Sequence, residues 1–256
     1  MPVKIAADLH IHSALSPCGS LEMSPAAIVN RALQIGLDAI AITDHNSVEN
    51  GFTAAAVGER LGLKVFCGME AQTEEEVHSL CLFDRRDQAE RFYEEIYPLL
   101  PPVKNQPDYF GDQVVVDEED NVVRFEEKLL INSLQLTLPD LLERVRRHDG
   151  SLIPAHVESP KYGLLVNLGF VPAELDRALL ELSYAVPFAQ VLAQYPDFRR
   201  RRLIVNSDAH YLSDIGRACT IFEADIASLA ALIAAGQEGR YRIGRRDGSG
   251  TLRIGE

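Results

Sequence analysis

Histidine and acidic residues gather in three short stretches of this chain, and together they are the side chains that bind divalent metals. The stretches are Asp8–His12, Thr43–His45 and Ser207–His210. They hold four of the seven histidines, and each lies beside or at the end of a short apolar run. Imidazole and carboxylate groups delivered together at strand ends predict a metal centre.

The first stretch places His10 and His12 two residues apart, so in a strand both imidazoles point to the same face. An isolated pair of this kind is more often polar surface on a solvated strand. The rest of the chain argues against that interpretation, because six of the seven histidines lie at or near apparent strand ends and only His148 does not. The other candidates of this kind are His45, Glu70, His78, His156, Asp208 and His210.

Short apolar runs alternate with helical patterns along most of the chain, which predicts an α/β fold with a largely parallel sheet. The expected strands are 3–7, 39–43, 65–69, 77–83, 152–155, 179–182 and 203–206. Expected helices cover 24–36, 47–61, 86–99 and 138–149, with Ser24-Pro25 as a helix start and Gly62 as a helix stop. In parallel α/β folds the carboxyl ends of the strands form one site.

Residues 101–136 break this alternation. Gln113–Val116 and Val122–Phe125 flank an acidic segment, which predicts a β-hairpin insertion. The hairpin is either a flap near the site or a surface and dimer contact. Near the C-terminus, Thr251–Ile254 is expected to add an edge strand.

Composition limits the possible partners. The 256 residues carry a net charge of −13, and an acidic surface repels nucleic-acid backbones and anionic membranes. We therefore expect a small phosphorylated substrate, no long nucleic acid and no membrane. Four cysteines without a Cys-x-x-Cys pair, no signal peptide and no spanning segment predict a reduced, cytoplasmic protein. The oligomeric state is left open.

The motifs Asp-x-His-x-His, Thr-Asp-His, Gly-x-Glu, Pro-Ala-His and Ser-Asp-Ala-His, between residues 8 and 210, resemble the PHP (polymerase and histidinol phosphatase) superfamily. The resemblance implies one PHP domain over residues 1–256, folded as a distorted (β/α)7 TIM-like barrel with the hairpin inserted. It also implies a cluster of two or three divalent metal ions: zinc, manganese or iron, with magnesium also possible.

Carried over by position, the resemblance assigns His10, His12 and Asp208 to a first metal and His78 and His156 to a second, with Glu70 bridging the two. His45 and His210 would hold a third metal. The chain departs from the family near Cys18, where a His or Asp is usual. Either the Cys18 thiolate is a ligand, which favours zinc, or Cys18 is a bystander and the third site is weak or empty.

These assignments predict hydrolysis of a phosphate ester by attack of a metal-bridging hydroxide. Glu70 fixes the metal spacing, and Asp44 and Asp208 orient ligands or move protons. Arg217 and Lys161 are candidates for binding the substrate phosphate, with a surface salt bridge as the alternative for each.

The expected function is a metal-dependent phosphoesterase acting on a small phosphorylated metabolite or nucleotide. The alternatives are a small nuclease cutting short oligonucleotides and a non-catalytic, metal-stabilised binding module. An amidohydrolase is a weaker alternative, because those enzymes commonly bridge their metals with a carboxylated Lys and no Lys occupies a comparable strand end.

Overall fold

The apolar runs of the sequence form the strands at the centre of the protein. The computed structural model describes residues 3–224, 228–247 and 251–255. All of the strands predicted from the sequence are present, as β1 (Lys4–Ile11), β2 (Ala39–Ile42), β3 (Lys64–Gln72), β4 (His78–Phe83), β7 (Ser151–Pro154), β8 (Leu179–Leu182) and β9 (Arg202–Val205). Three more strands follow, β10 (Ala218–Glu223), β11 (Tyr241–Arg246) and β12 (Leu252–Ile254), the last being the predicted edge strand.

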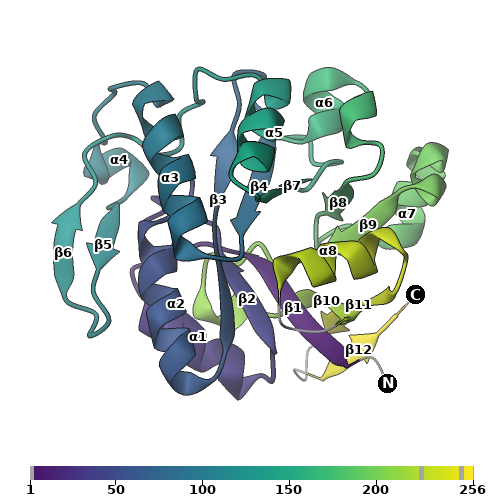
Figure 1. Ribbon diagram of the computed structural model, residues 1–256, viewed down its shortest axis with the longest axis horizontal. Helices are drawn as coiled ribbons and strands as arrows, with labels where there is room; N and C mark the ends of the chain where they lie inside the picture. The colour runs from purple at the N-terminus through teal and green to yellow at the C-terminus, as the bar shows by residue number, and fades with distance from the viewer. Residues whose placement is uncertain (1–2, 225–227, 248–250, 256) are drawn as a thin grey trace.

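Helices surround the sheet (Figure 1), and the four that the sequence predicts are present as α1, α2, α3 and α5, with starts within two residues of those expected. The Ser24 side chain accepts a hydrogen bond from the Ala27 N–H and so caps α1, and Gly62 ends α2 in a left-handed conformation. The helices are α1 (Pro25–Gln34), α2 (Glu49–Leu61), α3 (Arg86–Ile96), α4 (Pro107–Phe110), α5 (Leu138–Arg147), α6 (Leu164–Leu168), α7 (Phe188–Gln194) and α8 (Leu229–Gln237). Among the described residues, no helix has the length and apolar character needed to cross a membrane.

The main sheet is mixed, which corrects the prediction of a largely parallel one. Its order is β12-β11-β10-β1-β2-β3-β4-β7, and only β1–β2 and β2–β3 are parallel pairs. The short link between Gln72 and His78 cannot cross over the sheet, so β4 returns antiparallel to β3. β10 and β11 also run antiparallel to their neighbours.

A separate parallel pair, β8–β9, lies between β7 and β10 and curls the sheet toward closure. On the β10 side, Val205 N–H donates to Thr220 Oγ1, and the same hydroxyl donates to the Val205 carbonyl. On the other side, the Val157 N–H just after β7 donates to the Glu181 carbonyl in β8. The result is a curled α/β architecture that brings the ends of β1 and β9 close together.

The predicted hairpin is present in the insertion as β5 (Val114–Val116) paired antiparallel with β6 (Val122–Phe125). It projects at the edge of the molecule beside α2 and α3 (Figure 1). Its base contacts the loop after β1, because Val114 N–H donates to the Ala14 carbonyl. The insertion therefore buttresses the segment that carries Cys18.

Close packing of α2 on β3 depends on Gly58. A Cβ atom built there would lie 2.6 Å from Val65 Cγ2 and 2.7 Å from the Leu63 carbonyl oxygen. We expect Gly58→Ala to lower the free energy of unfolding by about 1–3 kcal/mol, because overpacking forces neighbouring groups to shift. Urea unfolding measures this, with Glu59→Ala on the exposed face of the same helix as control. An unchanged midpoint for Gly58→Ala would contradict the packing described here.

Candidate metal centre

The carboxylate of Glu70 lies at the centre of a ring of imidazoles. Its side chain is 2% exposed, and five histidine nitrogens lie within 3.5 Å of its two oxygens. The distances are 3.4 Å to His10 Nε2, 3.5 Å to His12 Nε2, 3.1 Å to His45 Nδ1, 2.9 Å to His78 Nδ1 and 3.2 Å to His156 Nε2. These side chains come from β1 and the residue directly after it, from β3 and β4, and from the loops after β2 and β7.

Asp208 and His210, in the loop after β9, complete the centre. Asp208 Oδ1 lies 3.5 Å from His10 Nε2 and 3.4 Å from His12 Nε2. The His210 ring stacks on His12 with 4.4 Å between ring centroids. Three groups of ligand atoms lie within 4.8 Å of one another: His10, His12 and Asp208; His45, Glu70 and His78; His12, Cys18 and His45. The structure thus brings together every residue that the sequence offered as a metal ligand.

A β-bulge turns the side chains of His10 and His12 toward this centre. Upstream in β1, Ile5, Ala7 and Leu9 face the core beneath α8, while Ala6 and Ile11 face the core beneath α1 and α2. Odd-numbered residues thus change from one face of the sheet to the other between Leu9 and Ile11. The cause is a register shift between Asp8 and Ile11, where β1 has one residue more than β2. In a regular strand the even-numbered histidines would point toward α1 and α2.

The charges of the centre suit bound cations. The histidine nitrogens converge closely: His10 Nε2 and His12 Nε2 lie only 3.2 Å apart. Burial lowers the pKa of His45 well below its usual range and lowers that of His210 to about 4, so both rings are neutral and offer lone pairs. His156 Nδ1 is buried without a hydrogen-bond partner among the described residues, and His45 Nδ1, although 3.1 Å from a Glu70 oxygen, makes no well-directed hydrogen bond to it. These features fit a metal cluster.

The carboxylates are ionised and ready to bind cations. Burial acts to raise the pKa of Glu70, but His78 and His10 hold it well below its usual range. The pKa of Asp208 is lowered in the same way, by His10 and His12 against the effect of burial. Cys18 is exposed as a residue, but desolvation of its thiol by the surrounding loop, together with the nearby carboxylates, Glu70 foremost, raises the thiol pKa, so in this structure that thiol is protonated.

Glu181 supports the centre and was missed in the sequence. It is buried in β8, and its carboxylate lies 3.0 Å from His10 Nδ1. It also accepts hydrogen bonds from Asn206 Nδ2 and the His156 N–H. This carboxylate fixes the tautomer and orientation of His10. The sequence feature that could have identified it is a single acidic residue inside the apolar run Leu179–Leu182.

Asp44 is also a support rather than a group that faces the cavity. Its carboxylate accepts hydrogen bonds from the Ser13 N–H, the Ser13 hydroxyl and the Ser16 hydroxyl. The Ser16 hydroxyl in turn lies 3.0 Å from His12 Nδ1 and accepts from the His45 N–H. Asp44 therefore orients the His12 ring and the His45 backbone through Ser16, and no sequence pattern pointed to either serine.

A cavity of about 300 Å³ opens over the centre. Lys161 lines it together with Ser159, Tyr162 and Ser183. Arg217 lies elsewhere: its guanidinium donates to the backbone carbonyls of Ser207 and Asp208 and packs 3.3 Å above the Tyr184 ring. Arg217 thus holds the loop that carries Asp208, and it also forms a salt bridge with Asp214 at 3.3 Å, which was the alternative expected for it; a role in binding a substrate phosphate stays a prediction.

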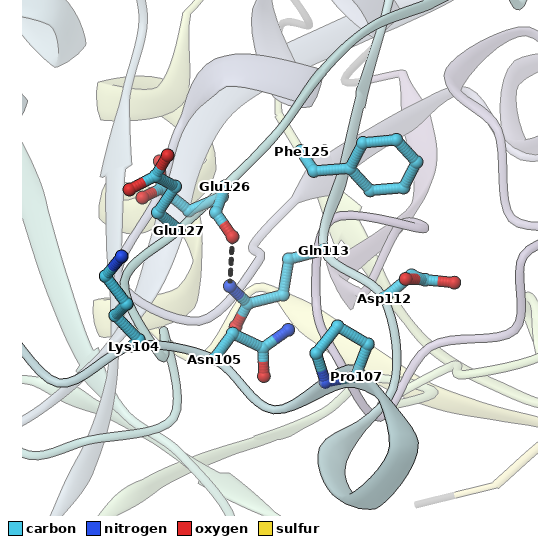
Figure 2. A pocket seen from close by; sticks show the side chains of 8 residues that line it. All are labelled: Lys104, Asn105, Pro107, Asp112, Gln113, Phe125, Glu126 and Glu127. Carbon is cyan, nitrogen blue, oxygen red and sulfur yellow. Dashed lines mark hydrogen bonds between the residues drawn. The ribbon is translucent and has the colours of Figure 1, made fainter.

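A second hollow, of about 390 Å³, lies in the insertion (Figure 2). Its side chains are those of Lys104, Asn105, Pro107, Asp112, Gln113, Phe125, Glu126 and Glu127. Gln113 Nε2 donates to the Glu126 carbonyl across it. Without imidazoles, this hollow lacks the chemistry of the centre, and its polar groups tie the insertion together.

Comparison with known proteins identifies the class. The PHP domain family matches residues 8–143, which is more than half of the chain, and a PHP-associated family matches residues 197–241. The chain belongs to the PHP domain family, as its motifs predicted. A PolC-type DNA polymerase III from Oceanobacillus iheyensis is 41% identical over 64 residues, which are 25% of this chain and 4% of the polymerase.

Solved structures share the fold. The lesion-specific endonuclease PfuEndoQ from Pyrococcus furiosus superimposes with a TM-score of 0.69 at 20% identity, covering 94% of this chain and 58% of the endonuclease. A two-domain protein from Bacteroides vulgatus, containing a predicted PHP-like metal-dependent phosphoesterase, gives 0.57 at 16% identity over 94% of this chain and 65% of its own. The chain thus spans less than two thirds of both proteins.

The expectation of no long nucleic-acid partner is wrong. Endonuclease Q, which has the same fold, has been solved in complex with a 27-mer duplex bearing an abasic lesion at the active site, with a TM-score of 0.69 at 19% identity over 92% of this chain and 57% of that one. A net charge sums the whole surface, whereas a nucleic acid meets one local face. The acidic composition alone therefore does not exclude a nucleic-acid partner.

The contact between Glu181 and His10 is expected to strengthen the binding of divalent metal. We expect Glu181→Gln to weaken binding of divalent metal by about 10- to 100-fold, because His10 loses the carboxylate that orients it and raises its basicity. Calorimetric titration of metal-free protein with Mn²⁺ or Zn²⁺ measures the affinity. Glu174→Gln, at an exposed position, is the control. Equal affinities for wild type and Glu181→Gln would show that His10 needs no such support.

Proposed function

We propose that this protein is a metal-dependent phosphoesterase that hydrolyses a phosphate ester at the Glu70 centre. The observation that carries the proposal is one buried carboxylate facing five imidazoles at the floor of an open cavity. Membership of the PHP domain family supports it. We also propose that residues 1–256 form a single PHP domain whose curled sheet is a distorted (β/α)7 barrel.

In this proposal the ligands divide into two main sets that share Glu70. His10, His12 and Asp208 would hold one divalent ion, and His78 and His156 would hold a second. His45 lies between the sets, close to both Glu70 and Cys18. The imidazole-rich donors suit zinc, manganese or iron, and a Cys18 ligand favours zinc. Bound divalent ions would neutralise the phosphate charge and lower the pKa of a coordinated water.

The remaining residues of the cavity have distinct tasks. The Glu70 side chain is 2% exposed at the floor of the cavity, so in this proposal it holds the spacing of the ligands and does not reach the leaving group. The Asp208 side chain is 31% exposed and is the better placed carboxylate to accept or deliver a proton at the cavity. Lys161 offers an ammonium group at the rim that binds a phosphate oxygen. Asp44 keeps His12 and His45 in orientation through Ser16.

Cleavage of a nucleic-acid phosphodiester is a second candidate function. The observation that favours it is the likeness to endonuclease Q, whose fold extends over nearly the whole of this chain. A defined oligonucleotide, supplied single-stranded, as an intact duplex and as a duplex with an abasic site, tests this candidate. Cleavage of one of these without hydrolysis of free mononucleotides assigns a nuclease, whereas release of phosphate from mononucleotides assigns a phosphatase.

Replacing Glu70 tests the proposed function itself. We expect the wild type with Mn²⁺ or Zn²⁺ to hydrolyse an aryl phosphate or a nucleotide, and Glu70→Gln to lower kcat/KM by about 100-fold or more, because both ion positions lose a shared ligand. Steady-state assays measure this, with the exposed-site variant Glu127→Gln as control.

One outcome would contradict the proposal that this protein is a phosphoesterase. A metal-loaded wild type that gains thermal stability from the ions, yet turns over no member of a phosphoester and oligonucleotide panel, would identify a non-catalytic, metal-stabilised binding module instead.

A further inference from the structure

The cavity over the centre has a second zone that is not built from metal ligands. Its members are the side chains of Ser159, Lys161, Tyr162 and Ser183, which come from the loops after β7 and β8. The zone offers two hydroxyls, one ammonium group and one aromatic ring. A substrate that uses all of them carries phosphate, hydrogen-bonding groups and a flat surface.

Tyr162 is the unusual member of this zone. Its ring stacks on the imidazole of His78 with 4.5 Å between centroids and an angle of 1° between the planes. His78 beneath it is 5% exposed, whereas Tyr162 is 43% exposed. Because one face of the tyrosine ring rests on the imidazole, the opposite face and the ring edge provide the exposed surface.

The backbone holds this ring in place. The His78 N–H donates to the Tyr162 carbonyl over 3.0 Å, so the two residues are joined by both a hydrogen bond and the ring stack. Tyr162 has φ +57°, a left-handed conformation that a bulky side chain rarely adopts. At the next position, a Cβ on Gly163 would lie 2.3 Å from the Ser159 carbonyl oxygen, so the loop is tightly folded. A ring fixed in this way loses little freedom when a ligand stacks on it.

We propose that Tyr162 is a stacking platform for a nucleobase, so that the site selects substrates whose phosphate is carried by a nucleoside rather than by a simple sugar or alcohol. This inference rests on the proposed function, because it places the phosphate at the Glu70 centre. The cavity volume of about 300 Å³ suits one nucleotide unit. Every base has a flat π-face, so such a platform accepts different bases, including one at a nucleic-acid end or in a flipped position.

A purely structural role for Tyr162 makes a different prediction. If the ring serves only to cover His78, its loss weakens metal binding and the binding of every phosphate compound to the same degree. A stacking platform affects only ligands that carry a base, and the metal content stays unchanged. The two roles are therefore separated by a matched pair of ligands.

The test uses adenosine 5′-monophosphate and ribose 5-phosphate, which differ by the base. Binding of each to Mn²⁺-loaded protein is measured by calorimetry for wild type, Tyr162→Phe, Tyr162→Leu and Tyr162→Asn. Asparagine tolerates a left-handed backbone, so this variant guards against misfolding of Tyr162→Leu. Metal content is measured in every sample.

We expect the wild type to bind adenosine 5′-monophosphate about 5- to 150-fold more tightly than ribose 5-phosphate, as base–aromatic stacking provides. Tyr162→Phe keeps this preference, while Tyr162→Leu and Tyr162→Asn lose it and retain their affinity for ribose 5-phosphate and metal. No preference in the wild type, or a preference that survives in both non-aromatic variants, overturns the proposal. Release of phosphate from adenosine 5′-monophosphate or an aryl phosphate by the wild type and by Tyr162→Asn, assayed in parallel, reports separately on whether the centre is a phosphoesterase.

Discussion

The buried carboxylate of Glu70 is the group on which the rest of this structure depends. An ionised carboxylate without solvent costs several kcal/mol unless charge and hydrogen bonds compensate it. Here its neighbours are five imidazoles. Burial holds His45 neutral. Burial also acts to lower the pKa of His10, but the carboxylates of Glu181, Asp208 and Glu70 raise that pKa well above its usual range. A proton on His10 thus offsets part of the carboxylate charge, and divalent ions between the rings and the carboxylates would offset it in place of that proton. The strand ends that converge on Glu70 are thus arranged for cations.

Two features beyond the ligands make this convergence possible. The bulge between Asp8 and Ile11 turns His10 and His12 away from the helices and toward Glu70. Buried carboxylates then lock the rings: Glu181 on His10, and Asp44 on His12 by way of Ser16. Such partners keep metal ligands in one orientation, and their loss affects affinity nearly as much as loss of a ligand.

Much of the fold and the ligand set could be predicted from the sequence, because apolar runs bounded by His, Asp or Glu report strands and their functional ends. The direction of β4 and the supporting roles could not. Strand direction depends on the length of the link after Gln72, not on the composition of the strand. The role of Arg217 depends on a loop that brings it behind Asp208, and Glu181 meets His10 only once β8 lies near β1. The prediction that long nucleic acid is not a partner failed because the net charge of a chain does not report where on the surface its charged residues lie.

In the proposed centre, two divalent ions would share Glu70 as a ligand. Anomalous diffraction from crystals of the protein soaked with Mn²⁺ would locate these ions. We expect one peak among His10, His12, Glu70 and Asp208, and a second peak beside Glu70 near His78 and His156. Fully occupied Mn²⁺ peaks elsewhere, or none within bonding distance of Glu70 at saturating metal, would contradict this proposal.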